Sequence, residues 1–582
     1  MKATDYIVEF LVKKGVQAVF GYPGGMVTHL MDSLYKASGI STKICCHEQG
    51  AGFAACGYAA AGGKPGVAFA TSGPGATNLI TAICHAYFES VPVVFITGQV
   101  NTYESRGEFN LRVRQKGFQE TDVVQMVSGV TKYAEYVDDV SKLPQCLEKA
   151  FQIAVSGRPG AVLLDIPMNV QRSQVEFNID CDSGVDITSE VEAAKAIADL
   201  ERELKSAKRA VILAGNGINS VGERDNFKRF AKTHELKIPF VTSMIAVDLF
   251  SADFKGCYGF IGAYGSRCAN MIVSQCDLLI SIGSRMDNRQ TGADITKFAP
   301  KAKIIRIDTD VEELKYKIKP DEMQINADLR DVMPLLSETE FSPYENDDWE
   351  SWRLQCDYYR EKLNDSGIDD YRVNKLIEDI SLLIPDDTFL AADVGQNQVW
   401  LAQSFKFKER QRMLFSGGHG AMGFSLPAAI GACYSLPKRN VYSFSGDGGL
   451  QMNIQELQFI RSENLPVKIF VLNNSSLGMI RCFQEMYFDS IYSYTVKGGG
   501  YTSPDFIEVA KAYGIDAFRI KSAAELEKHK NRLIDNTPVL FDVDIGDRTY
   551  VTPKLAYNKP VYDQDPPIER ALLEELLKDR KI

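Results

Sequence analysis

Several features that would assign a chain to a specialised class are missing from this sequence of 582 residues. No CxxC pair occurs among its 12 cysteines, so neither a zinc site nor a disulfide framework is indicated. No uncharged apolar run is long enough to span a bilayer, and no tract has a strongly biased composition. The net charge is −11, without the basic clusters that are typical of nucleic-acid binders. We therefore expect a cytoplasmic protein with neither a membrane nor a nucleic acid among its partners.

The length exceeds what one hydrophobic core usually holds, since single domains run to about 100–200 residues. Residues 67–98 read as an apolar strand, a Gly-Pro-Gly turn, a helical pattern and a second apolar strand, and two later blocks repeat this alternation. Continuous apolar strands joined by helices predict parallel sheets covered on both faces. We predict three doubly wound α/β domains and a tail, which cover 1–170, 190–340, 370–550 and 551–582. The polar stretches 171–190 and 336–368 are interpreted as linkers.

Residues 440–474 place an acid and an amide at the ends of two neighbouring strands. An apolar strand ends in GDGG at 446–449, an amphipathic helix follows, and a second apolar strand ends at Asn474. The carboxyl ends of parallel strands bind ligands, and glycines there let backbone N–H groups approach a diphosphate. Oxygen ligands from Asp447 and Asn474 suit Mg²⁺, with the carbonyl of Ser476 as a third. A GDGG cluster alone would indicate only a turn, but its pairing with Asn474 favours a metal–diphosphate site.

A second segment, 46–78, places Glu48 ahead of a helix rich in small residues. Together the two segments resemble the signatures of thiamine diphosphate enzymes. The resemblance implies that Glu48 contacts N1′ of the aminopyrimidine. It also implies that Met422, within SGGHGAMGF at 416–424, props the bent cofactor. The cofactor would carry the difficult chemistry while the protein supplies contacts and shape.

Further motifs make the resemblance more specific. They occur in order along nearly the whole chain: GYPGG (21–25), SGPGATN (72–78), GFQETD (117–122), GSRMDNRQTG (283–292) and VGQNQVW (394–400). Together they are similar to the catalytic subunit of acetohydroxyacid (acetolactate) synthase. That family decarboxylates pyruvate and adds the resulting acyl anion to a second 2-oxo acid. The implied domains bind the thiamine pyrimidine (N-terminal), a catalytically silent FAD (central), and the diphosphate with Mg²⁺ (C-terminal).

The resemblance assigns roles residue by residue. Catalytic roles fall on Glu48, Gln119, Met422 and Arg289. The metal ligands are Asp447, Asn474 and Ser476. Contacts to thiamine diphosphate are Gly25, Pro74, Asn78, Gln99, Gly395, Gln396, Gly420, Met422, Gly446, Gly448 and Gly449. Contacts to FAD are Arg158, Gly215, Gly217, Thr242, Arg285, Asp308, Glu313 and Asp328.

The substrate pocket is implied to consist of Phe118, Met168, Phe260, Arg289 and Phe483. Arg289 would bind the carboxylate of the second 2-oxo acid, because a planar guanidinium fits a carboxylate bidentately. Phe118 would line the same pocket. Other positions depart from the family pattern: Met168 stands for a lysine, Phe260 and Ile261 for a methionine and a histidine, and Phe483 for a tryptophan. The stretch before Phe118 is also longer and more basic than usual.

These departures leave the acceptor open. The leading hypothesis is a carboligase that makes acetolactate, and the alternatives are a nucleotide-linked keto-sugar acceptor or a pyruvate oxidase-type flavoenzyme. The resemblance further implies a homodimer or homotetramer in which Glu48 and Asp447 of different chains serve one cofactor. Whether a regulatory small subunit joins the assembly is not decided by the sequence.

Overall fold

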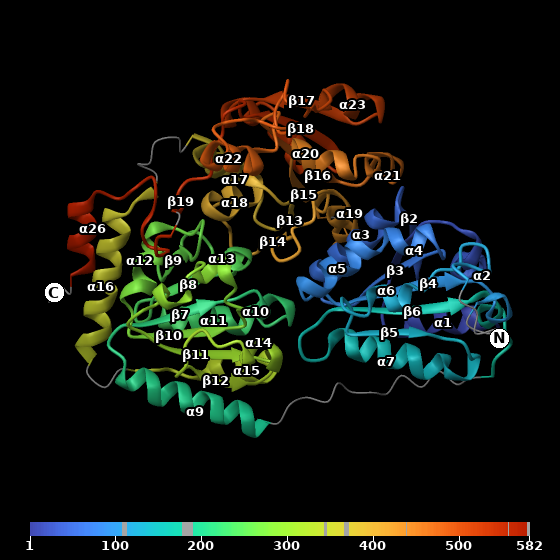
Figure 1. Cartoon of the computed structure of the whole chain (residues 1–582), viewed down its shortest axis with the longest axis horizontal. Coiled ribbons are helices and arrows are strands. Elements are labelled where there is room, and N and C mark those ends of the chain that lie inside the picture. Colours follow the sequence, from blue (N-terminus) through green and yellow to red (C-terminus); the bar gives the residue numbers. More distant parts are fainter. Residues whose placement is uncertain are drawn as a thin grey trace. The chain divides into compact units, whose positions relative to one another are not determined.

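A computed structural model describes residues 1–106, 113–176, 190–342, 346–365, 372–437, 439–556 and 558–578 of the chain. Contacts divide the chain into two compact units. Unit 1 combines Met1–Asp186, Asp387–Asn397 and Arg412–Asp547, and unit 2 combines Ile187–Asp386, Gln398–Gln411 and Arg548–Ile582. Unit 1 contains two six-stranded parallel sheets and unit 2 contains one, each flanked by helices (Figure 1). The predicted doubly wound α/β class is confirmed.

The first sheet of unit 1 is built from the N-terminal part of the chain. Its strands in spatial order are β2 (Ser41–Ile44), β1 (Ala18–Gly21), β3 (Gly66–Ala70), β4 (Val93–Gln99), β6 (Ala161–Pro167) and β5 (Tyr133–Tyr136). Its helices are α1 (Ala3–Lys13), α2 (Thr28–Lys36), α3 (Glu48–Gly62), α4 (Pro74–Asn78), α5 (Ile80–Phe88), α6 (Val123–Val127), α7 (Leu143–Val155) and α8 (Met168–Gln171). Alternate residues of β4 enter opposite cores: Val93 and Phe95 face α3 and α5, while Val94 and Ile96 face α1 and α7.

The second sheet of unit 1 comes from the C-terminal part. Its strands in spatial order are β14 (Arg412–Phe415), β13 (Phe389–Ala392), β15 (Val441–Gly446), β16 (Val467–Asn473), β18 (Val539–Asp544) and β17 (Asp516–Ile520). The helices of this region of the sequence are α17 (Arg372–Leu383), α18 (Gln396–Ser404), α19 (Ser425–Ser435), α20 (Asp447–Met452), α21 (Glu456–Ser462), α22 (Gly478–Tyr487), α23 (Phe506–Ala512), α24 (Ala523–Glu527) and α25 (Lys530–Ile534).

Helices α3 and α19 pack closely because small residues line both. A Cβ on Gly57 would come within 2.0 Å of the carbonyl oxygen of Ala428. A Cβ on Gly431 would come within 1.7 Å of the carbonyl oxygen of Ala54. Only glycine permits this approach of the two backbones. This packing explains why α3, which begins at Glu48, is rich in small residues: it allows the N-terminal and C-terminal parts of unit 1 to pack closely through α3 and α19.

Unit 2 contains the third sheet. Its strands in spatial order are β12 (Met323–Asn326), β11 (Lys303–Asp308), β10 (Leu278–Ile282), β7 (Ala210–Ala214), β8 (Phe240–Thr242) and β9 (Cys257–Phe260). Its helices are α9 (Glu190–Ser206), α10 (Gly217–Ser220), α11 (Arg224–His234), α12 (Arg267–Gln275), α13 (Asn288–Thr291), α14 (Val311–Lys315), α15 (Leu329–Glu338) and α16 (Asn346–Lys362).

The interpretation of 336–368 as a linker was wrong for most of that stretch. It contains α16, a helix of 17 residues that packs on the sheet of unit 2. The charged composition hides a helical stripe, since Trp349, Trp352, Cys356 and Tyr359 recur at intervals of three or four residues and are all buried. Of the other predicted linker, 171–190, residues 177–189 lie outside the described residues.

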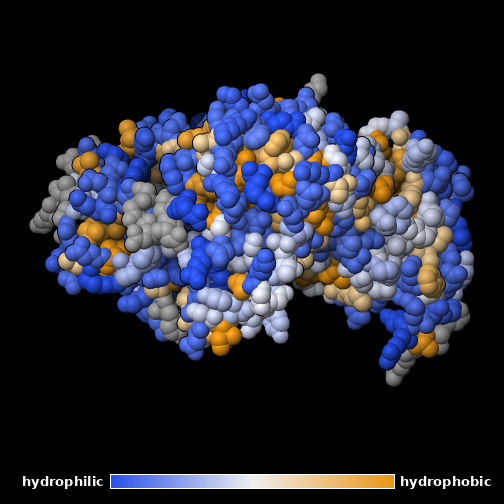
Figure 2. Space-filling model, turned by 90° about the horizontal axis from the view of Figure 1, so that it is seen from above, coloured by the Kyte–Doolittle hydropathy of each residue, from blue (hydrophilic) through white to orange (hydrophobic). Residues whose placement is uncertain are grey.

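The C-terminal tail is part of unit 2. A short antiparallel pair, β19 (Lys554–Leu555) and β20 (Gln564–Asp565), precedes α26 (Arg570–Leu577), and the hydroxyl of Tyr358 on α16 donates to Glu575 at 2.6 Å. The surface in Figure 2 is largely hydrophilic, with hydrophobic residues in small groups. Across the described ranges, no helix combines the length and apolar character needed to cross a membrane.

Candidate functional site

All three sheets share one topological feature. In each, the strand order changes direction between two neighbouring strands, and the crevice at such a switch point is where doubly wound folds bind ligands. The switch points lie between β1 and β3, between β7 and β10, and between β13 and β15. The loops that leave these strand pairs at their carboxyl ends are 22–25 with 71–75, 215–217 with 283–285, and 393–396 with 446–449. Each pair contains residues that the sequence singled out.

Asp447 lies directly after β15 and begins α20. Its side chain is buried, and burial raises its pKa to about 6. The hydroxyl of Tyr501 donates to Oδ2 of Asp447 at 3.1 Å. Within the described residues, no group of three or more His, Cys, Asp or Glu side chains could hold a metal. A cation at Asp447 would therefore take its other ligands from groups of a different kind, such as amide or carbonyl oxygens, and Mg²⁺ commonly adds phosphate oxygens to such a set.

Asn474 follows β16, the neighbour of β15, and is buried. Its Oδ1 accepts from the backbone N–H of Ser476 at 3.2 Å, and its Nδ2 donates to Oε1 of Gln396 at 2.9 Å. The Oγ of Ser476 is buried and has no hydrogen-bond partner among the residues described. The structure thus brings Gln396, Asn474 and Ser476 together beside β15, the strand that Asp447 follows.

Met422 contacts the backbone of the GDGG segment. A Cβ on Gly448 would lie 3.2 Å from Cε of Met422 and 2.8 Å from Cδ2 of Leu477, so that position leaves no room for a side chain. The loop around Met422 turns through Gly420 and Gly423, which have φ values of 68° and 82°. Gly395, with φ 116°, turns the loop after β13.

Asp393, which the sequence analysis did not select, hydrogen-bonds to the backbone of the loop that contains Met422. It lies directly after β13 and is fully buried, with its pKa raised to about 6 by burial. Its carboxylate accepts from the backbone N–H groups of Val394, Gly423 and Ser425 at 2.9–3.2 Å. A Cβ on Gly449 would lie 2.9 Å from Oδ1 of Asp393, which explains the last glycine of the motif. The signal in the sequence was an acid at the end of an apolar strand, the same pattern as Asp447.

Glu48 is the first residue of α3 and is buried. Its Oε2 accepts from Nδ2 of Asn78 at 2.9 Å. A Cβ on Gly75 would come within 3.2 Å of Oε1 of Glu48, which places the Gly-Pro-Gly turn against the carboxylate. Pro74 begins α4 in this turn, and Gly25 begins a 3₁₀ turn after β1. The predicted pyrimidine-side residues therefore gather at the first switch point.

Gln119 also contacts the Gly-Pro-Gly turn. It adopts a left-handed conformation with φ 64°, and a Cβ on Gly73 would come within 2.9 Å of Cβ of Gln119. Gln99, at the end of β4, instead uses its amide internally: Nε2 donates to the carbonyl of Thr121 at 2.8 Å and to the buried Asp165 at 2.9 Å. In this chain Gln99 and Asp165 thus fix the loop that carries Gln119.

The expected nucleotide crevice of unit 2 is formed by close backbone contacts. A Cβ on Gly215 would come within 2.1 Å of the carbonyl oxygen of Gly283, and one on Gly217 within 2.9 Å. Thr242 ends β8, and its buried Oγ1 has no hydrogen-bond partner in the described part of the chain. The two glycines are thus required by the packing of the two loops against each other, while the hydroxyl of Thr242 leaves a polar group for a ligand at this edge of the sheet.

Of the remaining predicted FAD contacts, Asp308 ends a strand, Glu313 lies in α14 and Arg158 lies in the other unit. Buried Arg306 donates to the carbonyl oxygens of Arg285 and Glu313 at 3.5 and 3.1 Å and so joins two of these loops. Asp308 ends β11, and Asp328 caps α15 through the N–H of Arg330 at 2.9 Å. Arg158 belongs to unit 1, where its Nε donates to Ser90.

The predicted acceptor residues are divided between the units. Phe118, Met168 and Phe483 belong to unit 1, and Arg289 and Phe260 to unit 2. Phe118 and Phe483 are 77% and 50% exposed, whereas Phe260 is buried at the end of β9. Arg289 is exposed on α13, with Nη2 3.8 Å from Sδ of Met244 and the guanidinium 5.9 Å from the ring centre of Tyr264.

Comparisons with known proteins identify the family of the chain. Three family models match: the N-terminal TPP binding domain of thiamine pyrophosphate enzymes over residues 1–126, their central domain over 197–336, and their C-terminal TPP binding domain over 393–543. The chain is 35% identical to an acetolactate synthase isozyme 2 large subunit from Escherichia coli, covering 95% of this chain and 97% of that protein. It is 36% identical to an acetolactate synthase large subunit from Corynebacterium glutamicum, covering 96% and 88%. With the corresponding subunit from Lactococcus lactis it shares 34% identity, covering 95% and 94%.

Proposed function

The chain belongs to the thiamine pyrophosphate (thiamine diphosphate) enzymes and is an acetolactate synthase-like carboligase, and on that premise we propose that it decarboxylates pyruvate and joins the two-carbon unit to a second 2-oxo acid. The observation that carries the proposal is the pairing of Asp447 and Asn474 at the end of adjacent strands, with Met422 against the glycines between them. At the N-terminal switch point, Glu48 accepts a hydrogen bond from Asn78 and is the proposed partner of the aminopyrimidine ring.

Magnesium and the diphosphate belong to this proposal. Asp447, Asn474 and the carbonyl of Ser476 would hold Mg²⁺, and the glycines at 446, 448 and 449 would let backbone N–H groups reach the phosphates. Met422 would support the bend between the two rings of the cofactor. When bound, thiamine diphosphate supplies the thiazolium carbon to which a 2-oxo acid adds before it loses carbon dioxide.

Glu48 would exchange a proton with N1′ of the aminopyrimidine. Its burial keeps water from competing for that hydrogen bond, and Asn78 fixes the orientation of the carboxyl group. Gln119, pressed against the Gly-Pro-Gly turn, would face the same reacting centre.

FAD would bind at the switch point between β7 and β10. The position of the 215–217 and 283–285 loops at a switch point and the unpaired hydroxyl of Thr242 among the described residues support it. In this proposal FAD is structural. Oxygen uptake during turnover of pyruvate would favour a pyruvate oxidase-type reaction instead.

Arg289 would recognise the carboxylate of the acceptor. Its guanidinium is exposed on a short helix, and the neighbouring Tyr264 ring orients it. Phe118 and Phe483 would form apolar walls for the acceptor side chain, with Met168 and Phe260 as further pocket residues. A planar, charged recognition group favours a 2-oxo acid over a neutral carbonyl compound.

The active unit in this proposal is at least a homodimer with the active site at the subunit interface. Large apolar side chains on and after α22 support it, because a single chain leaves them exposed: Ile480, Phe483, Met486, Tyr487, Phe488, Ile491 and Tyr494. The enzyme would work in the cytoplasm, where thiols stay reduced, and the cysteines of the described residues are free.

Product analysis by NMR tests the proposal. The purified chain with thiamine diphosphate and Mg²⁺ is given pyruvate alone, then pyruvate with a longer 2-oxo acid, then pyruvate with a nucleotide-linked keto-sugar. Acetolactate from pyruvate alone and a mixed product with the second 2-oxo acid are expected. Formation of a carbon–carbon bond only with the keto-sugar, or of acetate with oxygen uptake, would overturn the assigned acceptor.

A further inference from the structure

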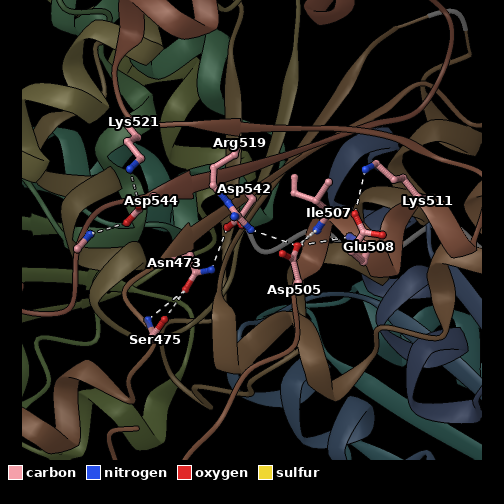
Figure 3. Close-up of polar contacts among 11 residues, drawn as sticks. Asn473, Ser475, Asp505, Ile507, Glu508, Lys511, Arg519, Lys521, Asp542 and Asp544 are labelled. Carbon is pink, nitrogen blue, oxygen red and sulfur yellow. Dashed lines mark hydrogen bonds and ion pairs between the residues drawn. The ribbon is translucent and has the colours of Figure 1, made fainter.

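The turn after β16 begins with Asn473, which hydrogen-bonds to Asp542 on the neighbouring strand β18 (Figure 3). Asp542 lies in β18 and is 1% exposed. Its Oδ1 accepts from Nδ2 of Asn473 at 2.9 Å, and its Oδ2 accepts from Nε and Nη2 of Arg519 at 3.2 and 3.1 Å. Both oxygens of this buried carboxylate are therefore engaged, one by the residue directly before Asn474.

This contact fixes the orientation of the Asn473 amide. An ionised carboxylate only accepts hydrogen bonds, so it selects the NH₂ group and leaves Oδ1 of Asn473 facing the turn. That oxygen accepts from the backbone N–H and the hydroxyl of Ser475 at 3.1 and 3.4 Å (Figure 3). The resulting Asx turn holds Ser475 in the left-handed region with φ 50°, a conformation that a serine rarely adopts without such support.

Asn474 and Ser476 alternate with these two residues along the turn. Oδ1 of Asn474 accepts from the N–H of Ser476, so the two candidate metal-binding groups are fixed relative to each other. We propose that Asp542 is a positioning residue for the metal site: through Asn473 it sets the turn that presents Asn474 and Ser476 to the cation beside Asp447. This inference rests on the proposed function, because Mg²⁺ and the diphosphate belong to that proposal.

The same network contains a matched control. Arg519 also donates to Oδ1 of Asp505 at 3.1 Å, and Asp505 caps α23 through the N–H groups of Ile507 and Glu508 (Figure 3). Asp505→Ala removes the cap and one partner of Arg519 but leaves the Asp542–Asn473 contact intact. It perturbs the fold locally without reaching the turn.

The decisive variant is Asp542→Asn. The introduced carboxamide has a single oxygen, which the charged Arg519 takes, so an NH₂ group faces Asn473. The Asn473 amide must then rotate to present its oxygen, and the N–H of Ser475 loses its acceptor. We expect the affinity for Mg²⁺, measured calorimetrically on the full chain with thiamine diphosphate present, to fall about 10–100-fold. The melting temperature without metal should fall no more than that of Asp505→Ala.

A second variant covers the case in which Asp542→Asn does not fold. Asn473→Ala keeps the Asp542–Arg519 pair and removes only the acceptor of the turn, and it should weaken Mg²⁺ binding by a similar factor. Asn474→Ala serves as the reference for the metal site itself. If Asn474→Ala binds Mg²⁺ like the parent, the proposed metal site is wrong. If it loses affinity while Asp542→Asn and Asn473→Ala bind no more weakly than Asp505→Ala, only the positioning role is overturned.

Discussion

The carboxylate of Glu456 holds the backbone of Cys46, two residues ahead of Glu48, although 410 positions separate the two residues in the chain. Both carboxylate oxygens lie 3.1 Å from the backbone nitrogen of Cys46. A Cβ on Gly50 would come within 2.4 Å of Oε1 of Glu456, so the start of α3 is fitted closely around the acid. Glu456, the first residue of α21, thereby fixes the backbone that leads to Glu48, the candidate catalytic carboxylate.

The stability of unit 1 should depend on pH through Glu456. Burial raises its pKa from 4.5 to about 7, so between these values the folded chain keeps a proton that the unfolded chain has released. The contribution of this carboxyl to the unfolding free energy falls as the pH rises through that window and is constant above it. Glu456→Gln removes the titration. The melting temperature of Glu456→Gln minus that of the parent should therefore increase between pH 4.5 and pH 7. The corresponding change in the difference of unfolding free energies is about 1–3 kcal/mol.

The control for this pH series is Glu508→Gln, a change of an exposed carboxyl on α23. Its melting temperature relative to the parent should be the same across the series. An equally flat difference for Glu456→Gln would show that this buried acid is already ionised at the low end of the range.

Replacing Glu48 by glutamine should separate catalysis from binding. The amide preserves the size of the side chain but cannot exchange a proton with the cofactor ring, so turnover of pyruvate should drop by about 10²–10⁴-fold. Calorimetric affinity for thiamine diphosphate should change by much less, because the diphosphate and metal contacts lie elsewhere. Activity close to that of the parent would refute the role assigned to Glu48.

Gly215→Ala should remove flavin from the purified protein. The added methyl group would meet the carbonyl oxygen of Gly283 at 2.1 Å, and separating the two loops changes the crevice at the switch point. An overpacking cost of about 1–3 kcal/mol corresponds to at least roughly a fivefold loss of affinity, readable from flavin absorbance per chain. Gly129→Ala, where no atom lies within 4 Å of the new Cβ, is the matched control and should retain flavin.

Arg289→Lys should weaken the use of the acceptor while sparing the donor step. Lysine keeps the charge but loses the bidentate geometry, so the KM for a second 2-oxo acid should rise about tenfold. Release of carbon dioxide from pyruvate should then exceed formation of the joined product. Arg202→Lys, a change of an exposed arginine on α9, should leave that ratio unaltered. Equal losses in both measurements for Arg289→Lys would argue against a role in acceptor binding.

Spacing along the chain singled out Asp447 and Asn474 as a candidate pair. A helical segment and an apolar strand separate them, and neighbouring parallel strands end at the same edge of a sheet. The fold class followed from the same periodicity. α16 was missed because its apolar stripe is narrow and its other positions are charged, so composition hid the 3.6-residue repeat.

Local spacing thus predicted which groups could bind a metal and a diphosphate, because Asp447 and Asn474 follow two adjacent strands joined by one helical segment, whereas the carboxylate-binding role of Arg289 followed only from the family resemblance. Only the tertiary structure decided what holds them in place. Asp393, Glu456 and Asp542 act on loops that are 30, 410 and 69 residues away, and no periodic pattern links such positions. Their buried carboxylates must find donors wherever the fold brings backbone N–H groups, amides or an arginine within reach. Which donors those are depends on how the whole chain packs, so it cannot be read from local sequence spacing.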